Sequence, residues 1–203
     1  MNFLISSNFK KHFNTYIDFV DHYWISYFDK KKIKFTIIPN TKNCDLSHFN
    51  KKNIKLIILP GGNDLISKSY LSKVRLKNEV KLINFGIKNK IPILGVCRGM
   101  QVINFFYKGK QTKIKNHMCT RHDVYFNYKF FNKKKLNVNS YHNFGIPINL
   151  LAKCLIPIGL DKSRNVEFFK HNKLKIFGSM FHPEREKKKN FLKLFIKKIL
   201  NKK

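Results

Sequence analysis

Cys97 is the residue best placed for chemistry, because it lies between two glycines where an expected strand meets an expected helix. The segment 95–101 reads GVCRGMQ and overlaps the end of a strand expected over 91–96. Gly95 and Gly99 carry no Cβ atoms that would clash in a sharp turn, so the thiol between them projects at the sheet edge. The helix N-terminus beside it favours the nucleophilic thiolate. The pattern predicts a nucleophile, although a lone cysteine is more often a buried apolar residue.

His182 is the best candidate for the base that a thiol nucleophile needs. It ends an apolar strand in the segment 180–184, which reads MFHPE. Residues i and i+2 of an extended segment project to the same side, so Glu184 can orient the imidazole while His182 relays the proton. Taken alone, Glu184 is equally compatible with a solvated first helical turn. The pairing with Cys97 favours the catalytic interpretation.

A glycine turn after another expected strand offers hydrogen-bond donors. The segment 59–64 reads LPGGND. Acyl transfer needs donors for the oxyanion of its tetrahedral intermediate, and a backbone without side chains approaches a ligand closely. We expect the backbone N–H groups of Gly62 and of Arg98 to form this oxyanion hole. The turn lacks the Gly-Lys-Ser/Thr ending of a phosphate-binding loop, which excludes that type of site.

Strands and helices must alternate to position these side chains. Continuous apolar runs that end at Pro, Gly or Asn predict strands buried on both faces, as in a parallel sheet. Apolar residues at steps of three and four predict the helices between them. The expected strands cover 2–6, 33–38, 54–59 and 91–96, and the expected helices cover 15–30, 71–87 and 99–107. This alternation predicts an α/β layered fold.

The second half of the chain is less regular, and hairpins are expected there. Strands are predicted over 123–131, 136–139, 166–170 and 173–181. A closing helix over 191–200 carries one apolar stripe, which favours core packing over the alternative of a Lys-rich helix on a membrane surface. No Gly/Ser/Pro-rich linker divides the sequence, so residues 1–203 are expected to form a single domain.

The chain is strongly basic, with 42 Lys+Arg against 11 Asp+Glu and a formal net charge of +31. A hydrophobic content of 43% distinguishes it from a disordered basic tail. Nearly all of the positive charge is lysine, whereas specific readout of phosphates and bases favours the guanidinium fork of arginine. The lysine runs 30–32, 133–135 and 187–189 are therefore interpreted as solvated surface. The charge can still steer small anionic substrates.

The cysteines and histidines give no sign of a disulfide framework or a metal site. Cys44, Cys97, Cys119 and Cys154 include no CxxC pair, which predicts reduced thiols. Neither a signal peptide nor an apolar span of about 20 residues is recognisable, so we expect a cytoplasmic location and no membrane contact. His117 and His122 have no second pair at ligand spacing, so neither a metal nor another cofactor is predicted.

Taken in order, these motifs resemble those of class I glutamine amidotransferases, and more closely their gamma-glutamyl hydrolase branch, which includes the peptidase C26 enzymes. The matching segments span most of the chain and read PGGND at 60–64, GVCRGMQ at 95–101, VNSYH at 138–142 and FHPE at 181–184. Arg98 and the segment 139–142 point to the hydrolase branch rather than to ammonia-supplying subunits. The segments 21–25 and 37–40 look like those of a subgroup that acts on gamma-glutamyl-CDP-amidate in capsule or surface-sugar biosynthesis.

The resemblance implies a flavodoxin-like three-layer α/β sandwich with a mostly parallel central sheet. It also implies a catalytic triad of Cys97, His182 and Glu184. A gamma-glutamyl amide would form a gamma-glutamyl thioester at Cys97, and water would then hydrolyse the thioester and release glutamate. The implied partner is a small gamma-glutamyl substrate, which could be anionic, and a homo-oligomer is compatible with the pattern.

The resemblance also implies residues that contact the substrate. Gln101 and Ser140 would help hold the glutamyl group, and Tyr141 and His142 would lie beside it. Without the resemblance, Tyr141 and His142 are equally compatible with ordinary loop packing. The chain departs from the family at Phe144, where a glutamine is common, and this change affects the pocket edge that faces the leaving group.

Two other functions stay open at the level of the sequence. The first is a glutaminase subunit that passes ammonia to a separate synthetase. The second, less favoured, is a nucleic-acid-binding protein in which lysines bind phosphates and Cys97 is unreactive. Substrate preference distinguishes the first from a hydrolase, and salt-dependent nucleic-acid binding would identify the second.

Overall fold

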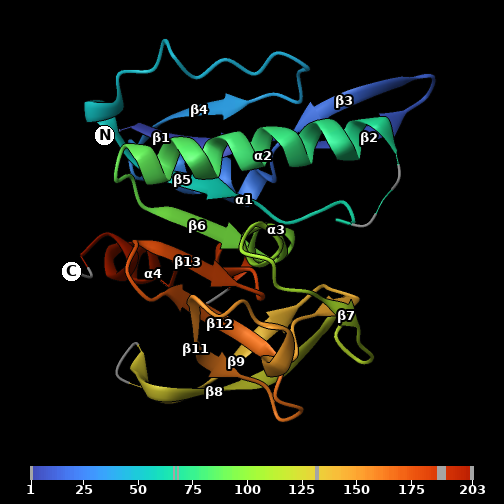
Figure 1. Ribbon diagram of the computed structural model, residues 1–203, viewed down its shortest axis with the longest axis vertical. Helices are drawn as coiled ribbons and strands as arrows, with labels where there is room; N and C mark the ends of the chain where they lie inside the picture. Colours follow the sequence, from blue (N-terminus) through green and yellow to red (C-terminus); the bar gives the residue numbers. More distant parts are fainter. Residues whose placement is uncertain (1, 66, 68, 131–132, 187–190, 202–203) are drawn as a thin grey trace.

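A 9-stranded sheet forms the centre of the computed structural model, which describes residues 2–65, 67, 69–130, 133–186 and 191–201 (Figure 1). Its parallel half contains, in order, β4 (Lys34–Ile38), β1 (Asn2–Ser6), β5 (Ile54–Leu59), β6 (Ile93–Val96) and β13 (Ile176–Ser179). Its antiparallel half continues with β12 (Val166–His171), β11 (Leu155–Leu160), β8 (Thr120–Phe130) and β9 (Lys133–Ser140). The carboxyl ends of the parallel strands therefore share one edge of the sheet.

Helices cover both faces of this sheet, namely α1 (His22–Lys30) and α4 (Phe191–Asn201) on one face and α2 (Tyr70–Lys88) and α3 (Arg98–Phe106) on the other. Trp24 of α1 and Phe195 of α4 pack in the same buried cluster as Phe3. Leu82 of α2 packs in the second cluster with Leu4, the next residue of β1. Successive strand residues point to opposite faces, so both clusters need apolar residues from every central strand. The predicted flavodoxin-like three-layer arrangement is confirmed.

The helix expected over 15–30 is wrong in its first part. Thr15–Phe19 is a strand, β3, which pairs with β2 (Asn8–His12) in an antiparallel hairpin. The helix α1 begins only at His22, where the Asp21 carboxylate accepts a hydrogen bond of 3.0 Å from the N–H of Tyr23 and caps the helix. The aromatic residues of the hairpin continue the helical spacing by coincidence, and pairing with β2 decides their conformation.

The second half contains the hairpins that the sequence predicts, with different boundaries. β8 pairs with β9 and β11 with β12. The strand β11 was not predicted, and the strand expected over 173–181 is confined to Ile176–Ser179. Phe131, the expected end of another strand, lies outside the described residues. The shorter elements are β7 (Thr112–Lys113), β10 (Phe144–Gly145) and the 3₁₀ helices Lys51–Asn53, Ile148–Leu150 and Pro183–Arg185.

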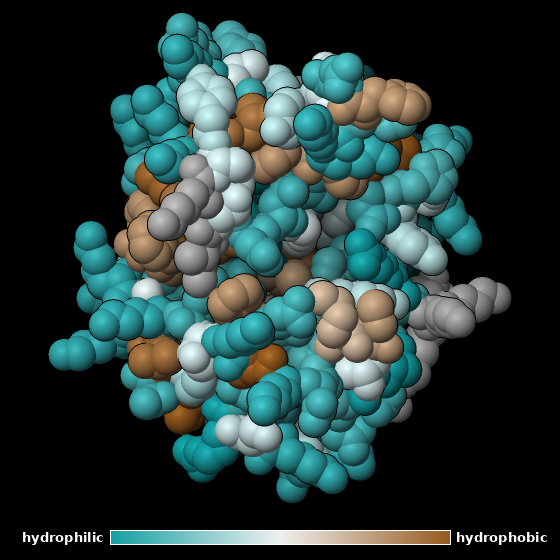
Figure 2. Space-filling model, turned by 90° about the vertical axis from the view of Figure 1, so that its right-hand side faces the viewer, coloured by the Kyte–Doolittle hydropathy of each residue, from teal (hydrophilic) through white to brown (hydrophobic). Residues whose placement is uncertain are grey.

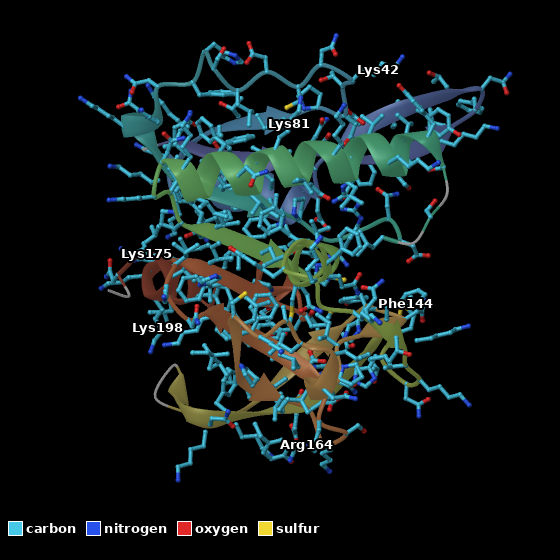
Figure 3. The ribbon with its side chains drawn as sticks, viewed as in Figure 1. Lys42, Lys81, Phe144, Arg164, Lys175 and Lys198 are labelled. Carbon is cyan, nitrogen blue, oxygen red and sulfur yellow. The ribbon has the colours of Figure 1, made fainter. Side chains whose placement is uncertain are left out.

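Lysines are distributed over the surface rather than gathered in one patch. Lys42 lies at the top of the molecule, far from Lys175 and Lys198 at its left side (Figure 3). The face onto which the parallel strands end is largely hydrophilic, with scattered apolar residues (Figure 2). Three lysine runs were expected at the surface. Lys30 and Lys134, from two of these runs, are exposed, and the run 187–189 lies outside the described residues. Within the described ranges, no helix has the length and apolarity needed to cross a membrane.

Candidate active site

The turn between β6 and α3 holds Cys97 in a backbone conformation that few side chains adopt. Cys97 has φ 50° and ψ −107°, and its N–H donates a 2.7 Å hydrogen bond to the carbonyl of Ser179. A Cβ atom on Gly99 would overlap the carbonyl of Leu59, and one on Gly95 would overlap the backbone of Gly99. The two glycines therefore let β5, β6 and α3 approach closely enough to form this strained turn.

His182 and Glu184 form a buried pair just after β13. The distance from His182 Nδ1 to Glu184 Oε1 is 2.6 Å, and both residues are buried. Burial lowers the pKa of His182, but the charge of Glu184 and hydrogen bonds with Cys97 and Glu184 outweigh it and raise this pKa to about 10. The imidazole is therefore protonated at neutral pH.

Cys97 and His182, the predicted nucleophile and base, meet beside Gly61. A Cβ atom on Gly61 would lie 2.6 Å from His182 Cε1 and 3.1 Å from both His182 Nε2 and the Cβ of Cys97. The imidazole thus presents Nε2 to the cysteine while Nδ1 faces Glu184. This meeting follows from topology, because β6 and β13 are adjacent parallel strands and end at the same edge of the sheet.

The glycine turn after β5 is held from the side of α2 by Arg75. Its guanidinium donates hydrogen bonds of 3.0, 3.3 and 2.9 Å to the carbonyls of Pro60, Gly61 and Gly62. In a trans peptide the N–H points opposite to the preceding carbonyl, so the Gly62 N–H points away from Arg75. This N–H has no acceptor among the residues that the structure describes, and Gly62 has φ +88°. An oxyanion donor requires such an unpaired N–H.

Arg98 lies inside the protein rather than at its surface. It is 2% exposed, and its guanidinium pairs with Glu79 of α2. Glu79 also pairs with Arg75 at 3.0 Å, so one buried carboxylate connects the helix after the nucleophile to the side chain that holds the glycine turn. The predicted contribution of Arg98 through its backbone N–H stays a prediction.

Ser140 and Tyr141 lie at the end of β9, and Tyr141 is close to His182. The Tyr141 ring is edge-on to the His182 ring with centroids 5.7 Å apart, and the Arg185 guanidinium lies 5.0 Å from the centre of the Tyr141 ring. Tyr141 is 38% exposed, so a ligand can reach it. The Ser140 hydroxyl donates a 2.5 Å hydrogen bond to the carbonyl of His117, so it holds a neighbouring loop.

Gln101 and His142 converge on the backbone of Phe144. The amide Nε2 of Gln101 is 3.1 Å from the Phe144 carbonyl, and His142 Nδ1 is also 3.1 Å from it. The other His142 nitrogen lies 3.7 Å from Glu167, on the side away from the Phe144 carbonyl. Phe144 lies close to β7, at the edge toward which the parallel strands run (Figure 3). The expected contacts of Gln101 and His142 with a glutamyl group stay predictions.

Sequence reasoning missed Asn139 and Glu186, which hold the segment of His182 in place. The Asn139 side chain accepts a 2.9 Å hydrogen bond from the His182 N–H and donates a 2.8 Å bond to the His182 carbonyl. Glu186 in turn accepts bonds of 2.8 and 2.7 Å from the backbone and side chain of Asn139. The available signal was Asn139 within the segment VNSYH, because an amide in a strand that becomes buried needs hydrogen-bond partners.

Comparisons with known proteins identify the family of the chain. The family model described as "Glutamine amidotransferase class-I" matches residues 15–201. The chain is 41% identical over 128 residues to the gamma-glutamyl-CDP-amidate hydrolase of Campylobacter jejuni, a match that covers 62% of this chain and 60% of that protein. It is 26% identical over 103 residues to a glutamine-hydrolyzing GMP synthase subunit of Methanococcus vannielii, which covers 50% of this chain and 54% of that protein. The chain thus aligns with less than two thirds of the length of either relative.

Solved structures share the fold. A putative GMP synthase subunit from Thermoplasma acidophilum superposes with a TM-score of 0.73 at 21% identity and covers 98% of this chain and 92% of that chain. A glutamine amidotransferase from Thermotoga maritima gives 0.69 at 20% identity, with 97% and 81% covered. With the family match over nearly the whole sequence, the chain belongs to the class I glutamine amidotransferase family.

Proposed function

We propose that this protein is a cysteine hydrolase that cleaves a gamma-glutamyl amide and releases glutamate. The observation that carries this proposal is that Cys97 and His182 lie side by side at Gly61, while the Nδ1 atom of His182 is bound to Glu184. The class I glutamine amidotransferase family and a relative named as a hydrolase support a hydrolytic reaction. We place the whole reaction in one catalytic domain, in the cytoplasm, without a cofactor.

The first step transfers the gamma-glutamyl group to Cys97. The thiol proton lies on His182, and the thiolate attacks the gamma-carbonyl carbon to form a tetrahedral intermediate. The N–H groups of Gly62 and Arg98 donate hydrogen bonds to its oxyanion. When the carbon–nitrogen bond breaks, His182 gives its proton to the leaving nitrogen, and Glu184 keeps the imidazole oriented.

The second step hydrolyses the thioester. His182, now neutral, accepts a proton from water while the hydroxyl oxygen attacks the same carbonyl carbon. The carbon–sulfur bond then breaks, His182 returns the proton to Cys97, and glutamate leaves. Tyr141, edge-on to the imidazole and partly exposed, is placed to contact the glutamyl group or its leaving group.

Gamma-glutamyl-CDP-amidate is our first candidate for the substrate. Its support is the identity of 41% with the Campylobacter jejuni hydrolase over part of both chains. The net charge of +31 favours a leaving group that carries phosphates. Phe144, which stands where the family commonly has glutamine, offers an apolar side chain at one edge of the pocket.

A panel of gamma-glutamyl compounds tests this proposal directly. Glutamine, gamma-glutamyl dipeptides and nucleotide-linked gamma-glutamyl amidates would be incubated with the purified chain, and released glutamate measured. We expect the highest kcat/KM with a nucleotide-linked amidate. Glutamate release from none of these compounds would refute the hydrolase proposal.

The alternative is a glutaminase subunit that supplies ammonia to a separate synthetase. The observations that favour it are the matches to the carbamoyl phosphate synthase small chain of Saccharolobus solfataricus and to the GMP synthase subunit described above. The same panel decides between the two, because a glutaminase would prefer glutamine and would gain activity when its synthetase is added. Preference for a large amidate without any partner favours the hydrolase.

A further inference from the structure

Histidine and carboxylate side chains gather in the antiparallel half of the sheet, apart from the proposed catalytic triad. His122 lies on β8 and Glu167 on β12, whereas His117 belongs to the segment before β8. One donor atom from each of these residues lies within 4.8 Å of the other two. The distance from His122 Nε2 to Glu167 Oε2 is 3.3 Å. Ligands bound at 2.0–2.2 Å to one tetrahedral ion are about 3.4 Å apart, so this spacing suits a shared cation.

The carboxylate of Glu167 is buried without hydrogen bonds. The residue is 0% exposed, and neither of its oxygens has a hydrogen-bond partner among the residues described. Nitrogens of His122 and His142 lie 3.3 and 3.7 Å from these oxygens, within ion-pair distance if the rings are protonated but without a hydrogen bond. A buried carboxylate is destabilising unless it is paired or coordinates a metal. A cation bound between Glu167 and His122 would satisfy both side chains.

The hydrogen bonds of His117 prepare one nitrogen for a cation. Its Nδ1 is 2.8 Å from the carbonyl of Lys115, and its Nε2 is 3.0 Å from Asp161 Oδ2. A carbonyl can only accept, so Nδ1 carries the proton and a neutral ring leaves a lone pair on Nε2. That lone pair faces a carboxylate, which is favourable only if a proton or a metal ion lies there. Metal-binding histidines commonly donate their other N–H to a backbone carbonyl in this way.

The cluster can be reached from solvent. A cavity of ≈ 340 Å³ is lined by His117, His122 and Asp161. Two basic side chains near it are already paired, Lys135 with Asp123 at 3.0 Å and Arg121 with Glu186 at 3.1 Å, while Lys162 also lines the cavity. These pairs reduce the positive charge that would repel an entering cation.

We propose that His117, His122 and Glu167 bind a divalent transition-metal ion, with zinc as the preferred ion. Two imidazoles and one carboxylate are a donor set that zinc accepts, with a further position open to the cavity. His142 and Asp161 lie next to this set as outer partners. The sequence analysis found only His117 and His122, on either side of Cys119. It did not find Glu167, because this residue lies on a strand that is distant in the sequence. The ion would tie the segment before β8 to β12, and through Ser140 it would steady the strand end that carries Tyr141.

Zinc binding can be measured on the full chain independently of its activity. All measurements start from a Cys97→Ala variant, called the parent. This substitution removes the thiol that, together with His182, could bind zinc at the proposed active site. After treatment with a chelator and its removal, the parent is titrated with Zn²⁺ by calorimetry and with Co²⁺ by visible absorption. We expect one ion per chain, a cobalt spectrum typical of four-coordinate nitrogen and oxygen ligands, and a higher melting temperature with zinc.

Variants of the ligands test the site itself. In the parent, Glu167→Gln and His122→Asn should each weaken zinc binding by more than about 100-fold, since loss of an outer partner alone reduces affinity about 10–100-fold. Cys119→Ser and His48→Asn, which change exposed residues outside the cluster, should bind as the parent does. If Glu167→Gln does not fold, His122→Asn becomes the deciding variant. The His122 side chain is 16% exposed, against 1% for Glu167, so its replacement disturbs the core less. A parent that binds no stoichiometric zinc, or ligand variants that bind like the parent, would overturn the proposal.

Discussion

The chemistry at the scale of single residues depends on the charge that surrounds one imidazole. Glu184 lies 2.6 Å from His182 and is buried with it, so little solvent screens their attraction. That attraction outweighs the burial that would otherwise lower the pKa of His182 and brings it to about 10. A protonated His182 stabilises a thiolate on Cys97 and supplies the proton that a leaving amine requires.

Replacement of the nucleophile should abolish turnover without unfolding the protein. We expect Cys97→Ala to reduce glutamate release by about 10,000-fold or more, as loss of a member of a catalytic triad does. Circular dichroism and the melting temperature should be nearly unchanged, because the substitution keeps a small side chain in the strained turn. Cys119→Ser, which changes an exposed cysteine, is the matched control and should retain full activity. Activity retained in the alanine variant would exclude Cys97 as the nucleophile.

The charge of Glu184 should also set the pH dependence. The folded pKa of His182 is raised, so the protonated form that donates to the leaving group persists at neutral pH and is lost as pH rises through about 10. We expect kcat/KM to fall on the alkaline side near that pH. Glu184→Gln removes the attracting charge and should move this limb to lower pH as well as reduce kcat. An unchanged alkaline limb in the variant would contradict the role given to Glu184.

At the scale of elements, two features of the packing hold the triad and the glycine turn in place. The first is the close approach of α3 to β5 at Gly99. The second is the buried pairing of Glu79 on α2 with Arg75 and Arg98. Burial and the charge of Arg98 lower the pKa of Arg75 to about 10, while Glu79 raises it, so Arg75 keeps its charge at neutral pH.

Gly99→Ala should destabilise the protein, because the added Cβ meets the Leu59 carbonyl and backbone cannot yield as a flexible side chain can. We expect a loss of about 1–3 kcal/mol in the free energy of unfolding, measured by urea denaturation. Activity should fall as well, since β5 carries the glycine turn. Phe105→Ala, at an exposed position of the same helix, is the control and should change stability much less. Equal stability of wild type and Gly99→Ala would show that the helix can move away without penalty.

Glu79→Gln should have a larger effect. It removes the carboxylate between two buried guanidinium groups, and breaking a buried pair from one side destabilises proteins by about 3–5 kcal/mol. Arg75 would also lose its anchor, so we expect kcat to fall even where the variant is folded. Lys135→Ala, which breaks an exposed pair with Asp123, should leave unfolding nearly unchanged and serves as the comparison. A Glu79→Gln variant as stable and active as wild type would show that the pairing of Glu79 with Arg75 and Arg98 does not support the site.

At the scale of the whole molecule, a net charge of +31 surrounds a site that we propose to bind an anionic substrate. The lysines are spread over the surface (Figure 3), so their effect is a general positive potential rather than one binding patch. Such a potential raises the rate of encounter and does not act on the chemical step.

Salt should therefore reduce kcat/KM selectively. Raising ionic strength from about 0.1 to 1 M shortens the Debye length from about 10 to about 3 Å. For a nucleotide-linked amidate we expect kcat/KM to fall by about 10-fold while kcat changes little. Glutamine, which has no net charge, is the control and should show a much smaller change. Equal salt effects on both substrates would mean that the positive surface does not guide the substrate.

The order of strand, glycine turn and helix could be predicted from the sequence because it depends on short-range causes. Steric limits at Gly95 and Gly99, the apolar runs of the strands and the i, i+2 spacing of His182 and Glu184 all act within a few residues. They were sufficient to predict an α/β layered fold and to nominate the triad, whereas the flavodoxin-like three-layer arrangement was implied by the family resemblance. The same local logic failed for Thr15–Phe19, where helical spacing was present but pairing with another strand decided the structure.

The tertiary structure alone decided which distant side chains support the site. Asn139 and His182 are 43 positions apart, and their hydrogen bonds exist only because β9 and the segment after β13 converge. The same holds for Arg75 over the glycine turn and for Glu167 beside His117 and His122. The sequence by itself determined the conformation of the turn at Cys97, most of the elements around it and the identity of the reactive groups. It did not determine these contacts, because sheet order and strand register bring distant residues together, and no local pattern records either.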